Sequence, residues 1–387
     1  MRVLKRATIA VVTAGMACGL LLAAASGASA QTITKTPKAF IDNFSVTQGP
    51  STIPAPPAPA DVNPYGVAVV PRSQGLLQKG DVLVSNFNDA ANAQGTGTTI
   101  VQVSPGGAVS LFAHIDPATI PAAACPGGVG LTTALSVLSS GWVIVGSLPT
   151  ADGTSATAQA GCLIVLDSHG NVRETFHGNG INGPWDMTAL DAGSIAELFV
   201  TNVLNGTVAA SPNVVNGGTV LRLLLVIAGN QPPRLITTTK IGSGFAERTD
   251  PAALVVGPTG VGLGANGTLY VADTVNSRIA AIPNAVLRFT SAGAGITVSR
   301  NGALNGPLGL AIAPGGDILT VNGLDGNIVE TTPFGKQVAV ATLDNSVPPP
   351  PPVLQPGNGT LFGLAVAPGG TGVYFVDDGE NQLNFFG

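Results

Sequence analysis

Hydrophobic and polar positions alternate in short runs along this chain, and one arrangement of runs recurs six times. In "GPTGVGLGANGTLYVADT", from Gly257, an apolar run, a Gly turn and a second apolar run end on a short polar residue. Related stretches begin with "NPYGVAVV", "CPGGVGL", "GPWDMTAL", "GPLGLAIAPGG" and "TLFGLAVAPGG". Short alternating runs separated by Gly and Pro turns predict strands. Four short strands per unit, repeated at intervals of about 50 to 75 residues, are typical of a β-propeller blade.

Three positions of the repeat share a residue type. The second apolar run ends on a polar residue that can stop the strand at a turn: Asn86, Ser147, Asn202, Asp273, Asn322 and Asp377. The first run is anchored by Gly66, Gly128, Asp186, Gly260, Gly309 and Gly363. Two residues later comes a small residue, as crowding of the innermost strands near an axis requires: Ala68, Gly130, Thr188, Gly262, Ala311 and Ala365.

The chain is therefore predicted to be an all-β, six-bladed β-propeller with four-stranded blades. The predicted blades span residues 63–113, 125–178, 181–242, 253–302, 304–344 and 357–387. The last of these has no residues left for an outer strand. The segment 38–46, "KAFIDNFSV", has a strand pattern and no partner of its own. We expect it to supply the missing strand and close the ring, because closure removes exposed sheet edges.

Asp273 is followed by an Asn and an Arg in "LYVADTVNSRI". We interpret Asp273 as the residue that caps the turn into the third strand, and Arg278 as its ion-pair partner.

The first 30 residues have the features of a signal peptide. Arg2, Lys5 and Arg6 precede 24 uncharged residues, and Ala28-Ser29-Ala30 forms a small-residue cleavage site before Gln31. An uncleaved membrane anchor is the alternative, and Cys18 raises the further alternative of a lipoprotein. Cleavage predicts an exported protein, periplasmic or extracellular, and the signal looks bacterial.

Charge limits the classes of partner. Removal of residues 1–30 takes away three of the 16 basic residues and none of the 21 acids, so the net charge becomes 13 − 21 = −8. With no basic stripe, nucleic acid is not an expected partner. With no basic amphipathic stretch, a membrane is not expected to be one after cleavage.

Two cysteines follow the cleavage site, Cys125 and Cys162. An exported chain meets oxidising conditions, so we expect a disulfide between them within the second blade. A metal pair is the alternative, but no histidine lies near either thiol in sequence.

The repeats resemble NHL repeats, a six-bladed propeller family. "LYVADTVNSRI" matches that family's strand followed by Asp, Asn and Arg, and "VYFVDDGENQL" is a weaker match. NHL propellers include both binding platforms and enzymes, so the resemblance implies the fold and leaves the function open.

The layout is also similar to that of gluconolactonase-type lactonases (the SMP-30 group), which hold a divalent metal in the channel with a Glu, two Asn and an Asp. The Glu starts the first blade in that group, whereas this chain has "VNPYGV" there. We expect no catalytic residues, no metal ligands and no cofactor, although such a channel has room for a divalent cation. The sequence thus favours a binding platform for a protein, peptide or glycan. A metal-dependent hydrolase or lactonase with a degenerate motif is the alternative.

One position suggests a ligand site. Where the repeat has Gly, the third blade has Asp186, with Trp185 before it. A carboxylate beside an indole at a channel mouth can hold a metal, a sugar or a cation. Asp273 and Asp377 are expected at the same end of their blades and complete the candidate set. In the alternative interpretation, Asp186 bonds to backbone and Trp185 covers the core.

Overall fold

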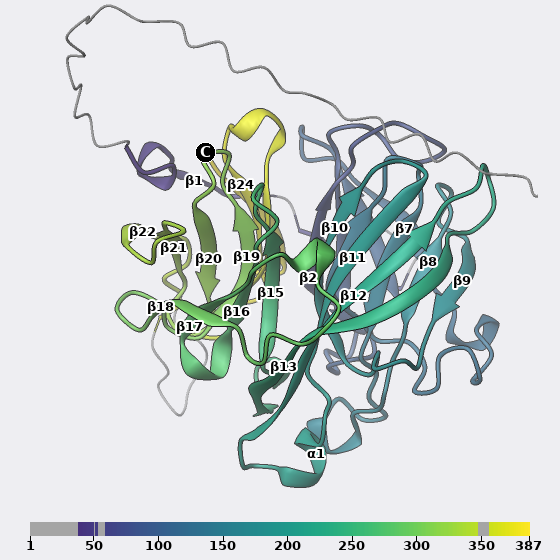
Figure 1. Cartoon of the computed structure of the whole chain (residues 1–387). Helices are drawn as coiled ribbons and strands as arrows, with labels where there is room; N and C mark the ends of the chain where they lie inside the picture. Colours follow the sequence, from purple (N-terminus) through teal and green to yellow (C-terminus); the bar gives the residue numbers. More distant parts are fainter. Residues whose placement is uncertain (1–37, 50, 53–58, 347–355) are drawn as a thin grey trace, which may run out of the picture. The chain divides into compact units, whose positions relative to one another are not determined.

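A computed structural model describes residues 38–49, 51–52, 59–346 and 356–387 of the chain (Figure 1). Contacts divide the chain into Met1–Lys38 and Ala39–Gly387, and the second unit is described below. The predicted signal peptide, residues 1–30, lies outside the described residues.

The second unit consists of six antiparallel sheets, as the six repeats predict. Blade 1 contains β2 (Val62–Val69), β3 (Val82–Asn88), β4 (Thr99–Val103) and β5 (Val109–His114). Blade 2 contains β6 (Leu131–Val137), β7 (Val143–Ser147), β8 (Leu163–Leu166) and β9 (Val172–Phe176). Blade 3 has five strands, β10 (Pro184–Asp191), β11 (Ile195–Asn202), β12 (Val215–Val226), β13 (Arg234–Asp250) and β14 (Leu254–Val256).

The other three blades have four strands each. Blade 4 contains β15 (Pro258–Leu263), β16 (Leu269–Asp273), β17 (Arg278–Ile282) and β18 (Ile296–Arg300). Blade 5 contains β19 (Pro307–Ile312), β20 (Ile318–Asn322), β21 (Asn327–Thr331) and β22 (Gln337–Thr342). Blade 6 contains β23 (Leu361–Val366), β24 (Val373–Asp377) and β25 (Gln382–Phe386), joined by β1 (Val46–Thr47).

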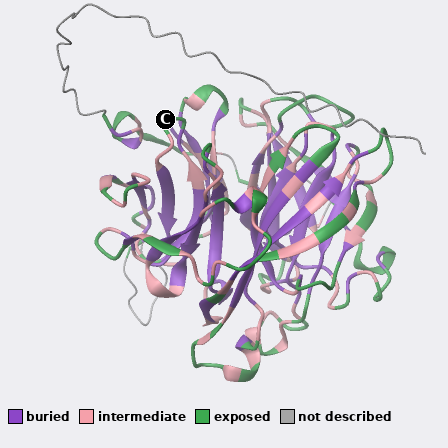
Figure 2. Ribbon diagram, in the orientation of Figure 1, coloured by how far each residue is buried: buried purple, intermediate pink, exposed green. Residues whose placement is uncertain are grey.

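The inner strands of the blades form a closed ring. Each inner strand contacts the next in the order β2, β6, β10, β15, β19 and β23, and β23 contacts β2 again. The second strands β3, β7, β16 and β20 are buried along their whole length, because Val, Ile and Leu on both faces pack against neighbouring blades (Figure 2). Helix is scarce: the described residues contain α1 (Thr207–Ala210) and short 3-10 turns such as Thr274–Asn276. The all-β six-bladed propeller predicted from the sequence is confirmed.

The ring is closed by the N-terminal segment, through fewer strand residues than predicted. Val46 pairs with Phe386 and Thr47 with Phe385, so β1 is the outer strand of blade 6. Within the predicted strand 38–46, Ile41–Asn43 instead forms a 3-10 helix. Glu330 on β21 binds this helix, because its two carboxylate oxygens accept the Phe40 and Ile41 N–H groups, each at 2.9 Å.

Removal of this segment is expected to weaken the propeller. A chain beginning at Gln48 loses β1, exposes the surface that Ile41 covers (Ile41 is 1% exposed) and leaves the buried Glu330 carboxylate without its two N–H partners. We expect its melting temperature to fall by at least about 5 °C relative to a chain beginning at Lys38. The measurement is thermal unfolding followed by circular dichroism. Equal melting temperatures for the two chains would show that the segment does not close the ring.

The six polar residues predicted to end the second strands lie at equivalent places, and five of them are the last residue of their strand, whereas β3 continues past Asn86 to Asn88. Each pairs with a residue near the start of its inner strand: Asn86 with Pro64, Ser147 with Leu131, Asn202 with Pro184, Asp273 with Pro258, Asn322 with Pro307 and Asp377 with Leu361. All six are buried.

Asp273 ends its strand in an ion pair, as its spacing from Arg278 predicts. Arg278 Nε lies 2.6 Å from Asp273 Oδ2, and the Asn276 amide donates to both oxygens of the same carboxylate at 3.1 Å. The rest of the guanidinium donates to Thr297 Oγ1 at 2.8 Å and to the Ala294 carbonyl at 2.7 Å. The Asp-Asn-Arg motif thus ties the turn after β16 to the outer strands of blade 4.

In blade 2 the repeat alignment is wrong by several residues. The inner strand starts at Leu131, and its pairing shifts between Leu131 and Leu135, where β6 advances by four residues against two in β7. The residue equivalent to the Gly anchors is therefore Ala134 and not Gly128. Gly128 has φ +99° and lies in the turn before the strand. The "CPGGVGL" stretch resembles a strand start in sequence, but a turn forms there.

Cys125 and Cys162 form the predicted disulfide, with Cα atoms 5.3 Å apart and both side chains buried in blade 2. The bond links the turn before β6 to the residue that precedes β8. Among the described residues, no helix is long and apolar enough to span a membrane.

Candidate functional site

The inner strands surround a central cavity of about 330 Å³. Each inner strand is an edge strand of its sheet. The backbone groups along its unpaired edge therefore face the channel. The cavity is lined by the second halves of these strands, and its half-buried residues include Val137, Leu263, Ile312 and Val366. The cavity therefore lies toward the end of the channel at which the inner strands finish.

Small residues line this cavity, as the repeat predicts. Five of the six predicted positions belong to the lining: Ala68, Thr188, Gly262, Ala311 and Ala365. In blade 2 the place is taken by Ser136, because of the shifted alignment, and Gly130 lies elsewhere, against Gly95 and Pro149.

The Gly anchors lie where neighbouring inner strands touch. A Cβ atom on Gly309 would lie 2.0 Å from the Phe362 carbonyl oxygen, and one on Gly363 would lie 2.2 Å from the Tyr65 carbonyl oxygen. A side chain at these places would force the strands apart. The joint between blades 3 and 4 is different, because it contains Asp186.

Asp186 bridges the two blades with its carboxylate. Oδ1 accepts the Met187 N–H at 2.8 Å, and Oδ2 accepts the Val261 N–H from the next inner strand at 3.1 Å. The Asp186 N–H donates to Thr201 Oγ1 at 3.1 Å, and that hydroxyl donates to the Thr259 carbonyl at 2.7 Å. The Asp186 carboxylate thus joins blades 3 and 4 by a hydrogen bond at the position where Gly309 and Gly363 let the inner strands of other blades approach closely.

Asp186 is also the one ionisable group among the described residues that line the cavity. Asp186 is 9% exposed. Burial raises the pKa of its carboxyl to about 8, against the opposing effect of the two backbone N–H groups. Removal from water disfavours the charged form, and no Lys, Arg or His of the lining compensates for it.

The other end of the channel is filled by residues 250–256, which we call the plug segment. It comprises the turn after β13 and the strand β14, and its residues Ala253–Val256 are buried in one hydrophobic cluster with the inner-strand residues Tyr65, Trp185, Leu308 and Phe362. The Trp185 indole N–H donates to the Val255 carbonyl at 3.1 Å, and the Tyr65 hydroxyl donates to the Ala252 carbonyl at 3.2 Å. The Tyr65 ring also stacks on Phe362, with centroids 3.9 Å apart.

Sequence reasoning missed the plug segment. Its signal is "PAALVV", an extra apolar run between the end of blade 3 and the "GPTGV" that starts blade 4. The run "PAAAC" before "PGGVGL" in blade 2 is similar but has no β-branched residue or leucine. An apolar run without a place in the repeat has to be buried somewhere, and the end of the channel is where it is buried.

The structure separates the four predicted site residues. Asp186 lines the cavity, whereas Trp185 is 3% exposed beneath the plug segment. Asp273 binds Arg278, and Asp377 Oδ1 accepts the Glu380 N–H at 3.1 Å. Burial and the Asp344 carboxylate raise the pKa of Asp377 to about 7. No three His, Cys, Asp or Glu side chains of the described residues lie within reach of one metal ion.

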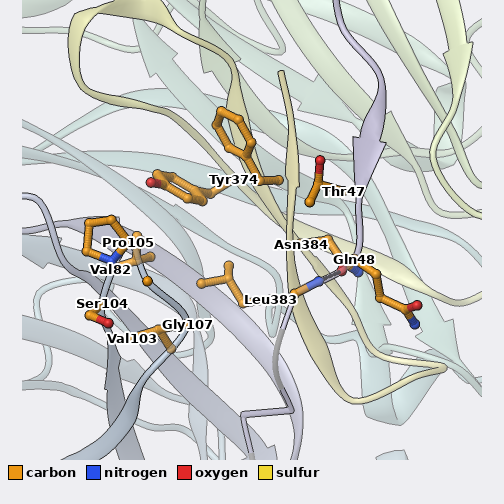
Figure 3. Close-up of a pocket in the computed structure, with 13 residues that line it drawn as sticks. Thr47, Gln48, Val82, Val103, Ser104, Pro105, Gly107, Tyr374, Leu383 and Asn384 are labelled. Atoms are coloured by element: carbon orange, nitrogen blue, oxygen red, sulfur yellow. Dashed lines mark hydrogen bonds between the residues drawn. The ribbon is translucent and has the colours of Figure 1, made fainter.

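A second hollow, of about 330 Å³, lies between blades 6 and 1, beside the closing strand (Figure 3). Leu383 and Tyr374 line it from blade 6, Val82 and Pro105 line it from blade 1, and Thr47 lines it from β1. The Tyr374 phenol is its one ionisable group among the described residues, and burial raises the pKa of that phenol. This hollow is the seam at which the ring closes, and it brings no set of polar groups together for chemistry.

Comparison with known proteins agrees with this architecture. No protein-family model matches the chain, and no curated protein matches its sequence significantly. Solved structures do match. A gluconolactonase from Xanthomonas campestris has a TM-score of 0.52 at 12% identity, and the match covers 84% of this chain and 86% of that one. A luciferin-regenerating enzyme has a TM-score of 0.53 at 10% identity, with 89% and 95% covered.

A calcium-binding protein, regucalcin, from Agrobacterium tumefaciens has a TM-score of 0.52 at 14% identity, and the match covers 88% of this chain and 95% of that one. These likenesses show the fold alone. The NHL resemblance read from the repeats stays a prediction, while the gluconolactonase-like layout is shared at the level of the propeller.

Proposed function

We propose that this chain is an exported binding protein whose ligand enters the central cavity from the end opposite the plug segment. The observation that supports this proposal is the asymmetry of the channel. At one end the plug segment packs on the inner strands, and the other end leaves a cavity with a single buried carboxyl in its wall. A cavity of this size is in the range of small-ligand sites.

The proposed partner is a protein, peptide or glycan, or a small molecule, that can place a slender group in the cavity. Asp186 is the residue of the predicted set that can meet such a group. Trp185, Asp273 and Asp377 act in the proposal as structural residues, because their polar atoms already have internal partners. Neither a cofactor nor a membrane or nucleic-acid partner is part of the proposal.

A metal-dependent lactonase is the alternative that the fold favours, since a gluconolactonase is among the similar structures. Two features of this chain argue for binding instead. The first blade starts with Asn63 and Pro64 and has no Glu there. The channel mouth where the inner strands start is occupied by the plug segment. A metal-assisted hydrolase needs several protein ligands around the ion and an open position beside it.

Met187 offers a direct test, because it lies in the cavity wall and the chain has only three methionines. The methionine methyl groups are labelled with 13C, and the NMR signal of Met187 is identified by its absence from Met187→Leu. We expect 1-hexanol, n-hexylammonium or both to shift this signal. Ala311→Phe and Ala365→Phe narrow the cavity from two blades and should abolish the shift. Ala151→Phe, at an exposed position, should leave it unchanged.

Failure of both probes to move the Met187 signal would contradict a binding cavity. The enzyme alternative is tested in parallel by metal analysis after extensive dialysis and by lactone hydrolysis. We expect metal content well below one ion per chain and no lactonase rate. A tightly held ion that Asp186→Ala removes together with a lactonase rate would overturn the proposal.

A further inference from the structure

The charge and hydrogen-bonding capacity of the cavity wall limit the chemistry of its ligand. Apart from Asp186, the described lining consists of Gly, apolar residues and two hydroxyl residues, Ser136 and Thr188. Both carboxylate oxygens of Asp186 already accept one N–H each, and a carboxylate oxygen has capacity to accept a second hydrogen bond. The wall therefore offers one buried carboxyl, which becomes a negatively charged acceptor when it loses its proton, and no fixed positive charge.

Three ligand classes fit this wall poorly. An anion would meet the Asp186 carboxylate without a cationic residue to offset it. A divalent metal ion would find one carboxylate, where protein sites for such ions use several oxygen or nitrogen ligands. A purely apolar molecule would fill the cavity but could donate no hydrogen bond to the remaining acceptor capacity of the Asp186 carboxyl.

An organic cation fits it well. An ammonium group has three N–H donors and no acceptor, so it complements the carboxylate and the free backbone carbonyls along the inner strands. An attached alkyl chain meets apolar side chains such as Leu263 and Ile312 beside the polar backbone edges of the inner strands. Because six inner strands surround the cavity and small residues line it, a slender chain fits better than a bulky one.

We propose that the cavity binds a slender alkylammonium ion, with the ammonium group against the Asp186 carboxylate and the chain directed toward the rim. This inference rests on the proposed function, because it names the ligand class of the same cavity. The ammonium group can belong to a free amine or to a lysine side chain of a peptide. The chemistry recognised is the same in both cases.

The acidity of Asp186 gives this ligand class a distinctive pH dependence. Burial holds the pKa of the carboxyl at about 8 in the free protein, whereas an amine of lysine type stays protonated to about pH 10. Binding of the cation below pH 8 therefore requires Asp186 to release its proton. The affinity should rise about tenfold per pH unit from pH 6 toward pH 8 and then level off. A neutral ligand should show no such rise.

The test is a titration of the Met187 methyl signal with n-hexylammonium and with 1-hexanol at pH 6, 7 and 8. We expect n-hexylammonium to bind at least tenfold more tightly than 1-hexanol at pH 8, and only its affinity to depend on pH. In Asp186→Asn, which keeps the shape of the side chain, both the preference and the pH dependence should disappear. The pH profile of the unmodified protein stands as an independent readout if that variant does not fold.

Equal affinities for the two probes, or an ammonium affinity that does not change with pH, would overturn the alkylammonium assignment and leave the binding cavity itself intact. Nα-acetyl-lysine N-methylamide distinguishes the two sources of the ligand. Affinity similar to that of n-hexylammonium favours a lysine side chain, and affinity at least tenfold weaker favours a free amine. Either result supports the ammonium chemistry, provided that n-hexylammonium itself binds as expected.

Discussion

Arg278→Met is expected to destabilise the propeller by about 3 to 5 kcal/mol, because it leaves the Asp273 carboxylate buried without a cation. Both partners are inaccessible, with side-chain exposures of 7% for Arg278 and 0% for Asp273. The substitution also removes the bonds from the guanidinium to Thr297 and Ala294, which connect the turn to blade 4's outer strands. Denaturant unfolding of the two proteins measures the difference.

A matched substitution separates this effect from the loss of any arginine. Arg173→Met breaks an ion pair with Asp167 at a position where the arginine is 49% exposed. Exposed pairs contribute about 0 to 1 kcal/mol, so this variant should unfold close to the unmodified protein. Adding Asp273→Asn to Arg278→Met should recover part of the lost stability, since the unpaired charge is then gone. Similar losses for Arg278→Met and Arg173→Met would contradict the account of the Asp-Asn-Arg motif.

Loss of the disulfide is expected to have a comparable effect. Cys125 and Cys162 are 37 residues apart in sequence, and the chain-entropy model gives about 3 to 4 kcal/mol for a closed loop of that length. The double variant Cys125→Ala/Cys162→Ala should therefore unfold at a clearly lower denaturant concentration than the oxidised protein. The reduced protein should behave like the double variant.

Thiol mapping provides the control for this second prediction. Alkylation of unfolded, unreduced protein followed by mass spectrometry should find neither Cys125 nor Cys162 modified. Modification of both, or unchanged stability in the double variant, would contradict a disulfide that stabilises blade 2.

The fold was largely predictable because the repeat carries redundant signals. Buried polar residues end the second strands in five blades, and small residues line the channel in five blades at the predicted places. Such signals follow from local chemistry: a strand has to stop at a turn, and inner strands have to fit around an axis. The Asp273–Arg278 pair was predictable for the same reason, since both residues flank one turn.

Features that depend on contacts between distant segments were harder to predict. In blade 2 the inner strand starts only at Leu131 and the equivalent anchor is Ala134, and nothing in the local sequence distinguishes the turn at Gly128 from a strand start. The segment before β1 folds as a 3-10 helix because Glu330, far away in sequence, accepts its N–H groups.

The candidate site was predictable only in part. Asp186 stands out in the sequence because it replaces a Gly of the repeat, and it does line the cavity. The surroundings of Trp185 could not be predicted, because the plug segment that covers it belongs to no repeat. The plug segment covers the end of the channel at which the inner strands start. The cavity lies toward the opposite end, at which they finish.

The acidity of Asp186 also has a consequence for stability. Its pKa is about 8 in the folded protein, and an unfolded Asp has a pKa of about 3.9. Between these values the folded chain holds a proton that the unfolded chain releases, so the free energy of unfolding falls as the pH rises. One such group contributes about 1.4 kcal/mol per pH unit within this window. The raised pKa values of Asp377 and Glu247 act in the same direction.

The proposed site requires that Asp186 is a buried carboxyl in the wall of the central cavity, without a cationic partner. The pH titration of this carboxyl tests the requirement most directly. The measurement is the 13C shift of the Asp186 carboxyl carbon as a function of pH in protein labelled at aspartate, with the signal identified by its absence from Asp186→Asn. We predict a titration midpoint near pH 8 in the free protein. A midpoint near pH 4 would show a solvated or paired carboxylate and would contradict the account of the cavity.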